Sequence, residues 1–382
     1  MLDPRLFTPS GLNTKFIGAG LTFSEYILAM QKIIAQARID IVAANHEEIL
    51  YCNSPFWWQP TLNHRINSKY RRGVILVHGL YDSPFIIMDI AQHLLAQGFL
   101  VCAVLLPGHG TVPGDLLNIQ YSEWIRALDY GIEQLKHQVE QVYCAGFSLG
   151  GTLALHHAAR DPDIAGLLLF APALQLRAEH IVTLLPLLKL INWAKDSWKW
   201  YRQVPQADFV KYSSFPYNAA YQIYRAIKVK NALLAKNPLK IPLFLVITAD
   251  DELIVPQSGV DFFSSYSNPL SKMIIYGNIL HPSDPRIEQR SSSFPDLKIL
   301  DFSHNCIATA ADNRHYGIAS HFQDFQHYPG GKPPLSSKKI FQGSIRPSNL
   351  ARATIQRLSY NPDFDYMMAA MDEFLENIAC QI

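Results

Sequence analysis

The chain has 382 residues, of which 49% are apolar and 17% charged, and its net charge is +1. This composition excludes a chain dominated by disorder, and the balanced charge argues against binding to nucleic acid or another polyanion. The length allows a large core, built as one α/β domain with insertions or as two smaller domains.

An amphipathic helix is predicted within an N-terminal extension that spans residues 1–70. Residues 22–25 (Thr-Phe-Ser-Glu) form a capping box, in which side-chain oxygens satisfy the free N–H groups of a first helical turn. Apolar residues then recur at helical spacing to about Ala43. The aromatic run 56–58 that follows is expected to pack against the main body.

Apolar strands alternate with helices from residue 71 onward. Strands are predicted at 74–77, 100–106, the run before 148, 164–170 and 242–247, and helices at 84–97, 122–137, 152–160, 258–266 and 364–378. Strands that are apolar throughout, with helices between them, indicate a mostly parallel sheet covered on both faces. We therefore expect an α/β core made of residues 71–174 and 240–382.

Two segments interrupt this alternation. Residues 175–239 are helical in pattern and rich in aromatic side chains, and are interpreted as a helical cap over the strand ends. Their very apolar stretch, residues 181–191, is expected to be a buried helix or the wall of a lid, with transient lipid contact as the alternative. Residues 316–360 are rich in Gly, Pro, Ser, His and Lys, and indicate a long surface excursion.

The five cysteines are few, odd in number and widely spaced, so we expect reduced thiols in a cytoplasmic protein. Cys102 and Cys144 lie in predicted strands and are expected to be packing residues. Residues 1–5 lack a charged start followed by an apolar core, so no secretory signal is visible. No apolar run is long enough for stable insertion into a membrane.

The clearest sign of catalysis is the Gly-x-Ser-x-Gly motif of residues 146–150, which lies between an apolar run and a helical pattern. A sharp turn between strand and helix strains the serine backbone and leaves room only for glycine at Gly146 and Gly150. Ser148 would then stand at a helix N-terminus, where peptide dipoles favour developing negative charge. Ser148 is the predicted nucleophile; the alternative is a Gly-Ser turn before an ordinary helix.

A serine hydroxyl needs a base to take its proton and an acid to orient that base. Asp251 directly follows a predicted strand, at the sheet edge where catalytic groups gather in parallel sheets. We prefer Asp251 because the apolar Leu253 and Ile254 can anchor the turn after it. Asp250 is the alternative acid.

Fourteen histidines compete for the role of base. His304 is preferred because it comes just after an apolar, strand-like run near residues 298–300, which would end at the same sheet edge. His281 follows the strand-like run 273–276 and is the main alternative, ahead of His315 and His321.

Two backbone N–H groups are expected to form an oxyanion hole. One belongs to Leu149, directly after the nucleophile, and the other to Leu80, in the turn that follows the first buried strand. His78 is expected to orient that turn, and His109 to order the Pro-Gly-His-Gly loop.

The chain resembles the α/β-hydrolase superfamily, and within it the bacterial carboxylesterases and monoacylglycerol-lipase-like enzymes. The resemblance covers about residues 72–310 and the last helix, and is carried by the motifs at 78–84, 106–110, 121–124, 146–151 and 251–254. It implies a catalytic triad of Ser148, Asp251 and His304, with the family's cap at 175–239. The long gap between Asp251 and His304 departs from the family pattern, and residues 1–70 and 316–360 have no clear counterpart in it.

The expected function is a serine esterase that works without a metal or an organic cofactor; residues 312–315 (Asp-Asn-Arg-His) make a poor metal motif. The aromatic cap favours a small hydrophobic substrate, such as a short- or medium-chain ester, a monoacylglycerol or a lysophospholipid. The same triad would also serve a thioester or a peptide-like amide. A non-catalytic ligand-binding or partner-binding protein on the same fold is the alternative from another class. The oligomeric state does not follow from the sequence.

Overall fold

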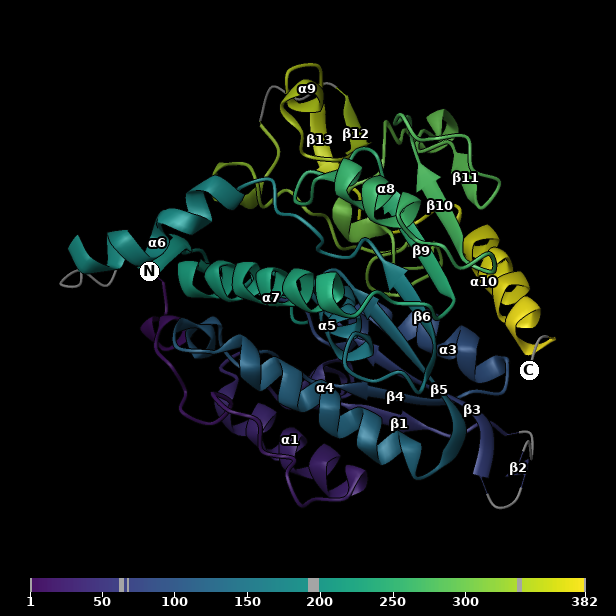
Figure 1. Ribbon diagram of the computed structural model, residues 1–382. Helices are drawn as coiled ribbons and strands as arrows, with labels where there is room; N and C mark the ends of the chain where they lie inside the picture. Colours follow the sequence, from purple (N-terminus) through teal and green to yellow (C-terminus); the bar gives the residue numbers. More distant parts are fainter. Residues whose placement is uncertain (1, 62–64, 67–68, 192–198, 335–338, 381–382) are drawn as a thin grey trace. The chain divides into compact units, whose positions relative to one another are not determined.

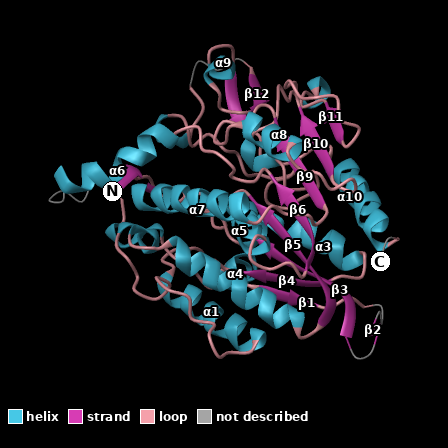
Figure 2. Ribbon diagram, viewed as in Figure 1, coloured by secondary structure: helices cyan, strands magenta, loops and turns pink. Residues whose placement is uncertain are grey.

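The computed structural model describes residues 2–61, 65–66, 69–191, 199–334 and 339–380. Contacts divide the chain into two compact units, residues 1–165 with 178–239 and residues 166–177 with 240–382. Each unit contains parallel strands with helices between them (Figures 1 and 2). The predicted α/β architecture is therefore confirmed.

The first unit is built on parallel strands whose apolar residues are buried. Strand β3 (Lys69–Val77) runs parallel to both β4 (Leu100–Val104) and β5 (Val139–Phe147), while β1 (Phe56–Trp58) adds an antiparallel edge to β4 and β2 (Arg65–Ile66) pairs with the start of β3. Cys102 and Cys144 are buried in β4 and β5 as expected. The helices are α1 (Phe23–Ala37), α2 (His46–Asn53), α3 (Met88–Ala96), α4 (Tyr121–Lys136), α5 (Leu149–Ala158), α6 (Glu179–Ile191) and α7 (Tyr217–Lys236).

The capping box predicted for the N-terminal helix is confirmed. Thr22 and Glu25 exchange both capping hydrogen bonds at the start of α1, and the four-residue spacing of Tyr26, Met30 and Ile34 gives the helix one buried face. The helix ends at Ala37 and not near Ala43, because Arg38 adopts extended backbone angles and its buried guanidinium binds Asp40.

Two other elements of this unit differ from the expectation. The aromatic run 56–58 does more than pack against the body, since it forms the edge strand β1. The helix predicted over 84–97 begins as a 3-10 turn, η2 (Pro84–Ile87), because Ile87 leaves helical geometry (φ −113°, ψ 6°) before α3 starts.

The second unit holds four parallel strands in the order β6 (Ile164–Phe170), β9 (Leu243–Thr248), β10 (Lys272–Tyr276) and β11 (Ile287–Arg290). Its helices are α8 (Pro256–Ser264), α9 (Pro347–Leu350) and α10 (Phe364–Ala379). Within residues 316–360, β12 (Ile340–Gly343) and β13 (Thr354–Arg357) form a separate parallel pair. The surface excursion predicted there therefore has regular structure of its own.

The strand predicted ahead of His304 is wrong. Among the described residues, Ile299 is paired only by isolated bridges, to Phe294 and Gln342, and the main sheet ends at β11 instead. The sequence of β11, Ile-Glu-Gln-Arg, has too few apolar residues to show the signature of a buried strand, because an edge strand contacts the sheet on one side only.

The stretch 181–191 falls within α6, which has buried and exposed apolar side chains. Val182 and Leu185 are buried, whereas Ile181 and Leu184 are 52% and 53% exposed. Residues 192–198 of the predicted cap lie outside the described residues. Among the helices that the structure describes, none combines the length and apolar character needed to cross a bilayer.

Helix α7 carries a buried lysine at the end of its buried face, which also holds Asn218 and Gln222. Ala219, Ile223, Ala226 and Ile227 are buried at helical spacing, and Lys230 continues the same face at 2% exposure. Burial lowers the pKa of Lys230 to about 8.

We predict that Lys230→Met stabilises the protein at pH 7. The pKa of Lys230 is lower in the folded chain than the ordinary 10.5, so burying the charged amine costs stability. This cost is fully present below pH 8, and the free energy of unfolding rises as the pH increases from about 8 to 10.5. Removing the charge should recover up to about 3 kcal/mol at pH 7, measured as a higher thermal midpoint. Lys228→Met, on the exposed face of α7, is the control and should change little. A lower midpoint for Lys230→Met would contradict the argument.

Candidate active site

Ser148 lies at a sharp turn between β5 and α5. Its backbone φ of 52° and ψ of −112° fall outside the regions that serine normally adopts. Helix α5 begins at Leu149, so the unpaired N–H groups of its first turn start directly after the serine. The predicted order of strand, turn and helix is confirmed.

The two glycines of the motif are required because there is no room for a Cβ atom at either position. A Cβ on Gly146 would collide with the backbone of Gly150, and a Cβ on Gly150 would collide with the carbonyl oxygen of Val77 at the end of β3. Any other residue at these positions would push the turn away from the strands that support it.

The turn of residues 78–81 lies beside this elbow and is ordered by two buried histidines. A Cβ on Gly79 would come 2.9 Å from the ring of Phe147, the residue before Ser148. His109 Nε2 accepts a hydrogen bond from the N–H of Tyr81 (3.0 Å), and His78 Nε2 accepts one from the N–H of Leu106 (3.1 Å). Both imidazoles are therefore neutral acceptors with structural roles, as expected. Burial lowers the pKa of His109 to about 4 and moves the pKa of His78 in the same direction.

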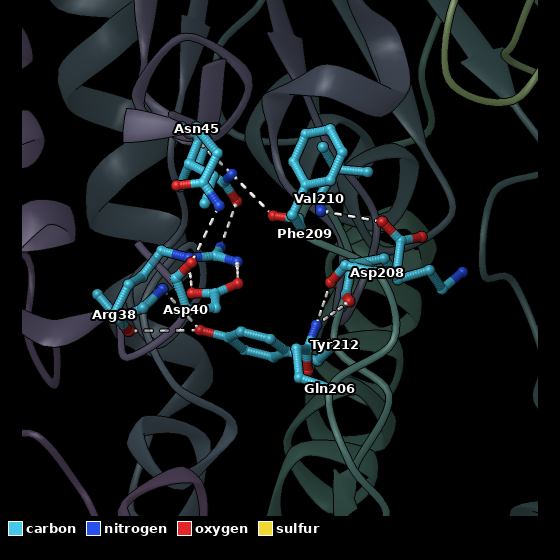
Figure 3. Close-up of polar contacts among 12 residues, drawn as sticks. Arg38, Asp40, Asn45, Gln206, Asp208, Phe209, Val210 and Tyr212 are labelled. Carbon is cyan, nitrogen blue, oxygen red and sulfur yellow. Dashed lines mark hydrogen bonds and ion pairs between the residues drawn. The ribbon is translucent and has the colours of Figure 1, made fainter. Parts of the chain in front are cut away.

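Segment 206–212 connects this turn to the N-terminal extension, and Figure 3 shows the polar contacts around Arg38, Phe209 and Tyr212. The N–H of Tyr212 donates to the carbonyl oxygen of Tyr81 (2.8 Å). Asn53 Nδ2 donates to the carbonyl oxygen of Phe209 (2.9 Å), and its Oδ1 accepts from the buried Arg38 guanidinium (3.2 Å). The extension is thus linked to the turn through segment 206–212.

Asp251 and His304 meet in the second unit. Asp251 follows β9, and its Oδ2 lies 2.6 Å from Nδ1 of His304, with both side chains nearly fully buried. The other carboxylate oxygen accepts the N–H groups of Leu253 and Ile254, each at 2.8 Å. Of the two apolar residues expected to anchor the turn, Ile254 is buried. Leu253 is 45% exposed, so its contribution comes through its backbone and not through its side chain.

The alternative acid and base have other partners in the second unit. Asp250 accepts from Ser292 Oγ (2.6 Å) and forms an ion pair with Arg346 (2.7 Å), and burial raises its pKa. His281 Nδ1 faces the carbonyl oxygen of the neighbouring Pro282 (2.9 Å). The ring of His315 packs against Tyr316 and Phe322, and His321 is exposed.

The residues singled out in the sequence are divided between the two units. Ser148, Leu80 and Leu149 belong to the first unit, whereas Asp251 and His304 belong to the second. Sequence reasoning missed three charged residues around Asp251 and His304, namely Glu252, Arg346 and Arg357. Glu252 gives no sign of its contact with the N–H of His304, and arginines about a hundred residues downstream have no local signature. In the described part of the chain, no three His, Cys, Asp or Glu side chains are grouped as metal ligands.

A family model described as serine aminopeptidase, S33, matches residues 68–283, which is more than half of the chain. The chain belongs to this family. The match includes the elbow at Ser148 and the acid turn at Asp251, and it ends before His304.

Two relatives with esterase or lipase names are similar to this chain. A thermostable monoacylglycerol lipase from Bacillus sp. (strain H-257) is 25% identical over 58% of this chain and 89% of its own length. A carboxylesterase from Bacillus subtilis (strain 168) is 23% identical over 49% of this chain and 75% of its own length. Among solved structures, a monoacylglycerol lipase from Paleococcus ferrophilus is 21% identical over 53% of this chain and 82% of that chain, with a TM-score of 0.42. The predicted class, a serine hydrolase of the esterase and lipase type, is confirmed by the family and the two relatives.

We predict that acid destabilises the protein in part through His109. Its pKa is about 4 when folded and 6.5 ordinarily, so the unfolded chain binds more protons between these values, and stability is lost as the pH falls through that window. His109→Gln keeps an oxygen for the N–H of Tyr81 but cannot take up a proton. Its thermal midpoint should therefore fall less between pH 7 and pH 4.5 than that of wild type, by the equivalent of up to about 3 kcal/mol. The exposed His321→Gln is the control, and an equal acid sensitivity in all three proteins would refute the prediction.

Proposed function

We propose that the protein hydrolyses carboxylic esters through an acyl-enzyme intermediate, with Ser148 as nucleophile, His304 as base and Asp251 as the orienting acid. The observation that supports this most strongly is the buried contact between Asp251 and His304 (2.6 Å). A serine elbow in the same chain supplies the third member of a triad.

The proposed reaction uses the tautomer that the Asp251 contact favours. If Nδ1 of His304 donates to Asp251, its Nε2 keeps a lone pair and can take the proton of Ser148 as Oγ attacks the ester carbonyl. The imidazolium then gives that proton to the leaving alcohol. A water molecule, deprotonated by the same nitrogen, attacks the acyl group, and the proton returns to Ser148 as the acid is released.

The N–H groups of Leu80 and Leu149 are the proposed oxyanion donors. Leu149 is the first residue of α5, and Leu80 lies in the turn whose Gly79 packs against Phe147. Donors of this kind, fixed before the reaction, each stabilise the tetrahedral intermediate by about 3 kcal/mol. The hydrogen bonds that His109 and Tyr212 make to Tyr81 support such fixation.

The proposed substrate is an ester with a hydrophobic acyl or alkyl chain, such as a short- or medium-chain ester, a monoacylglycerol or a lysophospholipid. The names of the two relatives support this class. Residues 175–239 would act as a cap, and the exposed Ile181 and Leu184 of α6 suit brief contact with lipid. A cavity of about 930 Å³ in the second unit, beside Asp250 and Asp301, is lined mostly by polar side chains and does not suit an acyl chain.

Amide hydrolysis is the second candidate, because the matching family is described as a serine aminopeptidase. The same nucleophile, base and oxyanion donors would cleave either bond. Aminoacyl anilides, assayed beside esters under the same conditions, separate the two substrate classes.

Ser148→Ala is expected to lower the hydrolysis of p-nitrophenyl esters by at least about 10³-fold for every acyl length that wild type accepts, because the nucleophile is lost. A fluorophosphonate probe should label wild type and leave this variant unlabelled. Ser265→Ala, at an exposed helix end, serves as the control and should match wild type. Equal ester hydrolysis by Ser148→Ala and wild type would reject the mechanism. Folded wild-type protein that takes up no probe would favour a non-catalytic binding protein.

A further inference from the structure

The segment 340–357 contains β12, α9 and β13 (Figure 1), and its side chains contact both loops that carry the proposed acid and base. All of these residues belong to the second unit. Two arginines of the segment bind the two carboxylates that flank Asp251 in the chain, namely Asp250 and Glu252.

Arg346 joins the acid loop to the loop before the base. Its Nη2 lies 2.7 Å from Asp250 Oδ1 and 2.7 Å from Asp301 Oδ2. Asp301 also accepts hydrogen bonds from the N–H of Ser344 (2.7 Å) and from Asn349 Nδ2 (2.8 and 3.0 Å). One guanidinium therefore fixes the separation of two carboxylates, one adjacent to Asp251 and one three residues before His304.

Arg357 acts on the other side of the acid. It forms an ion pair with Glu252 Oε1 (2.5 Å), and the side chains are 12% and 6% exposed. The second oxygen of Glu252 accepts the N–H of His304 (3.0 Å). Next to the histidine, Ser303 Oγ donates to the carbonyl oxygen of Leu358 (2.5 Å). The backbone of His304 is thus held through Glu252 by an arginine of β13.

We propose that Arg346 and Arg357 are positioning residues, which keep the Asp251 carboxylate and the His304 imidazole aligned for proton transfer. The inference rests on the proposed function of Asp251 and His304. Buried ion pairs are often no more stabilising than apolar residues of similar size, so a geometric role accounts better for the five charged side chains that the two arginines and their partners bring together here. For Arg346 the planar guanidinium suits that role, because Nη2 donates to Asp301 and Nε donates to Ser344 Oγ in fixed directions. Arg357 acts through its charge, because its contact with Glu252 is an ion pair without the geometry of a hydrogen bond.

This arrangement assigns the segment a role in holding the loop that carries His304. More than fifty residues separate Asp251 from His304, and the strand expected ahead of the histidine is absent. The loop that carries the base is held instead by contacts from residues 344–358, on the far side of it in the sequence.

The test compares Arg346→Met and Arg357→Met with wild type in p-nitrophenyl butyrate hydrolysis. We expect kcat to fall about tenfold or more with KM within about twofold, because misaligned catalytic groups slow the chemical step and not substrate binding. Arg357→Lys keeps one charge for Glu252 and should recover part of kcat; a lysine variant no better than methionine would overturn the role assigned to that charge. Arg352→Met, at an exposed arginine of the same segment, is the matched control.

Folding of each variant is checked by its thermal midpoint. Arg346 lines the open polar cavity, so water can reach the carboxylates that its removal exposes. Arg357→Met leaves Glu252 buried without its counter-charge; if that variant does not fold, Arg357→Met with Glu252→Gln removes both charges and is assayed in its place. Folded variants with wild-type kcat would overturn the inference. The proposed function is tested independently by Ser148→Ala, and it is rejected if that variant keeps wild-type ester hydrolysis.

Discussion

The contact between the Asp251 carboxylate and the His304 imidazole is the interaction on which the arrangement of the second unit depends. Withdrawing such groups from water costs several kcal/mol unless their polar atoms find partners in the protein. Asp251 meets this requirement with one oxygen on the imidazole and the other on two backbone N–H groups. The carboxylate is left with a single orientation, and Nδ1 of the imidazole is directed at Asp251.

Backbone strain is the corresponding constraint in the first unit. Ser148 and Tyr81 both have positive φ values, which cost non-glycine residues about 1–3 kcal/mol each and persist only where the surroundings enforce them. At Ser148 the enforcement comes from β5, α5 and the close approach of Gly150 to Val77. At Tyr81 it comes from His109 and Tyr212, and the latter lies in a segment tied to the N-terminal extension. The extension thereby helps to shape the turn beside Ser148.

The features that could be predicted from the sequence are those with local physical causes. The capping box at Thr22, the buried strands and the glycine-flanked turn at Ser148 each depend on a few consecutive residues, and the structure has all of them. Asp251 and His304 were preferred among rivals, but the reasons were partly wrong. Ile254 is buried as expected, but Leu253 is exposed, and residues 298–300 directly before the histidine form no regular strand, because the supports come from residues 344–358. Arg346 and Arg357 bind partners 45 to 105 residues away in the chain, and no periodicity or motif marks contacts of that range.

A crystal structure of the protein after reaction with a fluorophosphonate ester would test the central claim most directly. The account predicts phosphorus bonded to Ser148 Oγ, a phosphoryl oxygen within hydrogen-bond distance of the N–H groups of Leu80 and Leu149, and Nε2 of His304 beside the adduct while Nδ1 remains on Asp251. An adduct at another residue, or a phosphonylated Ser148 with the imidazole of His304 out of reach, would contradict it.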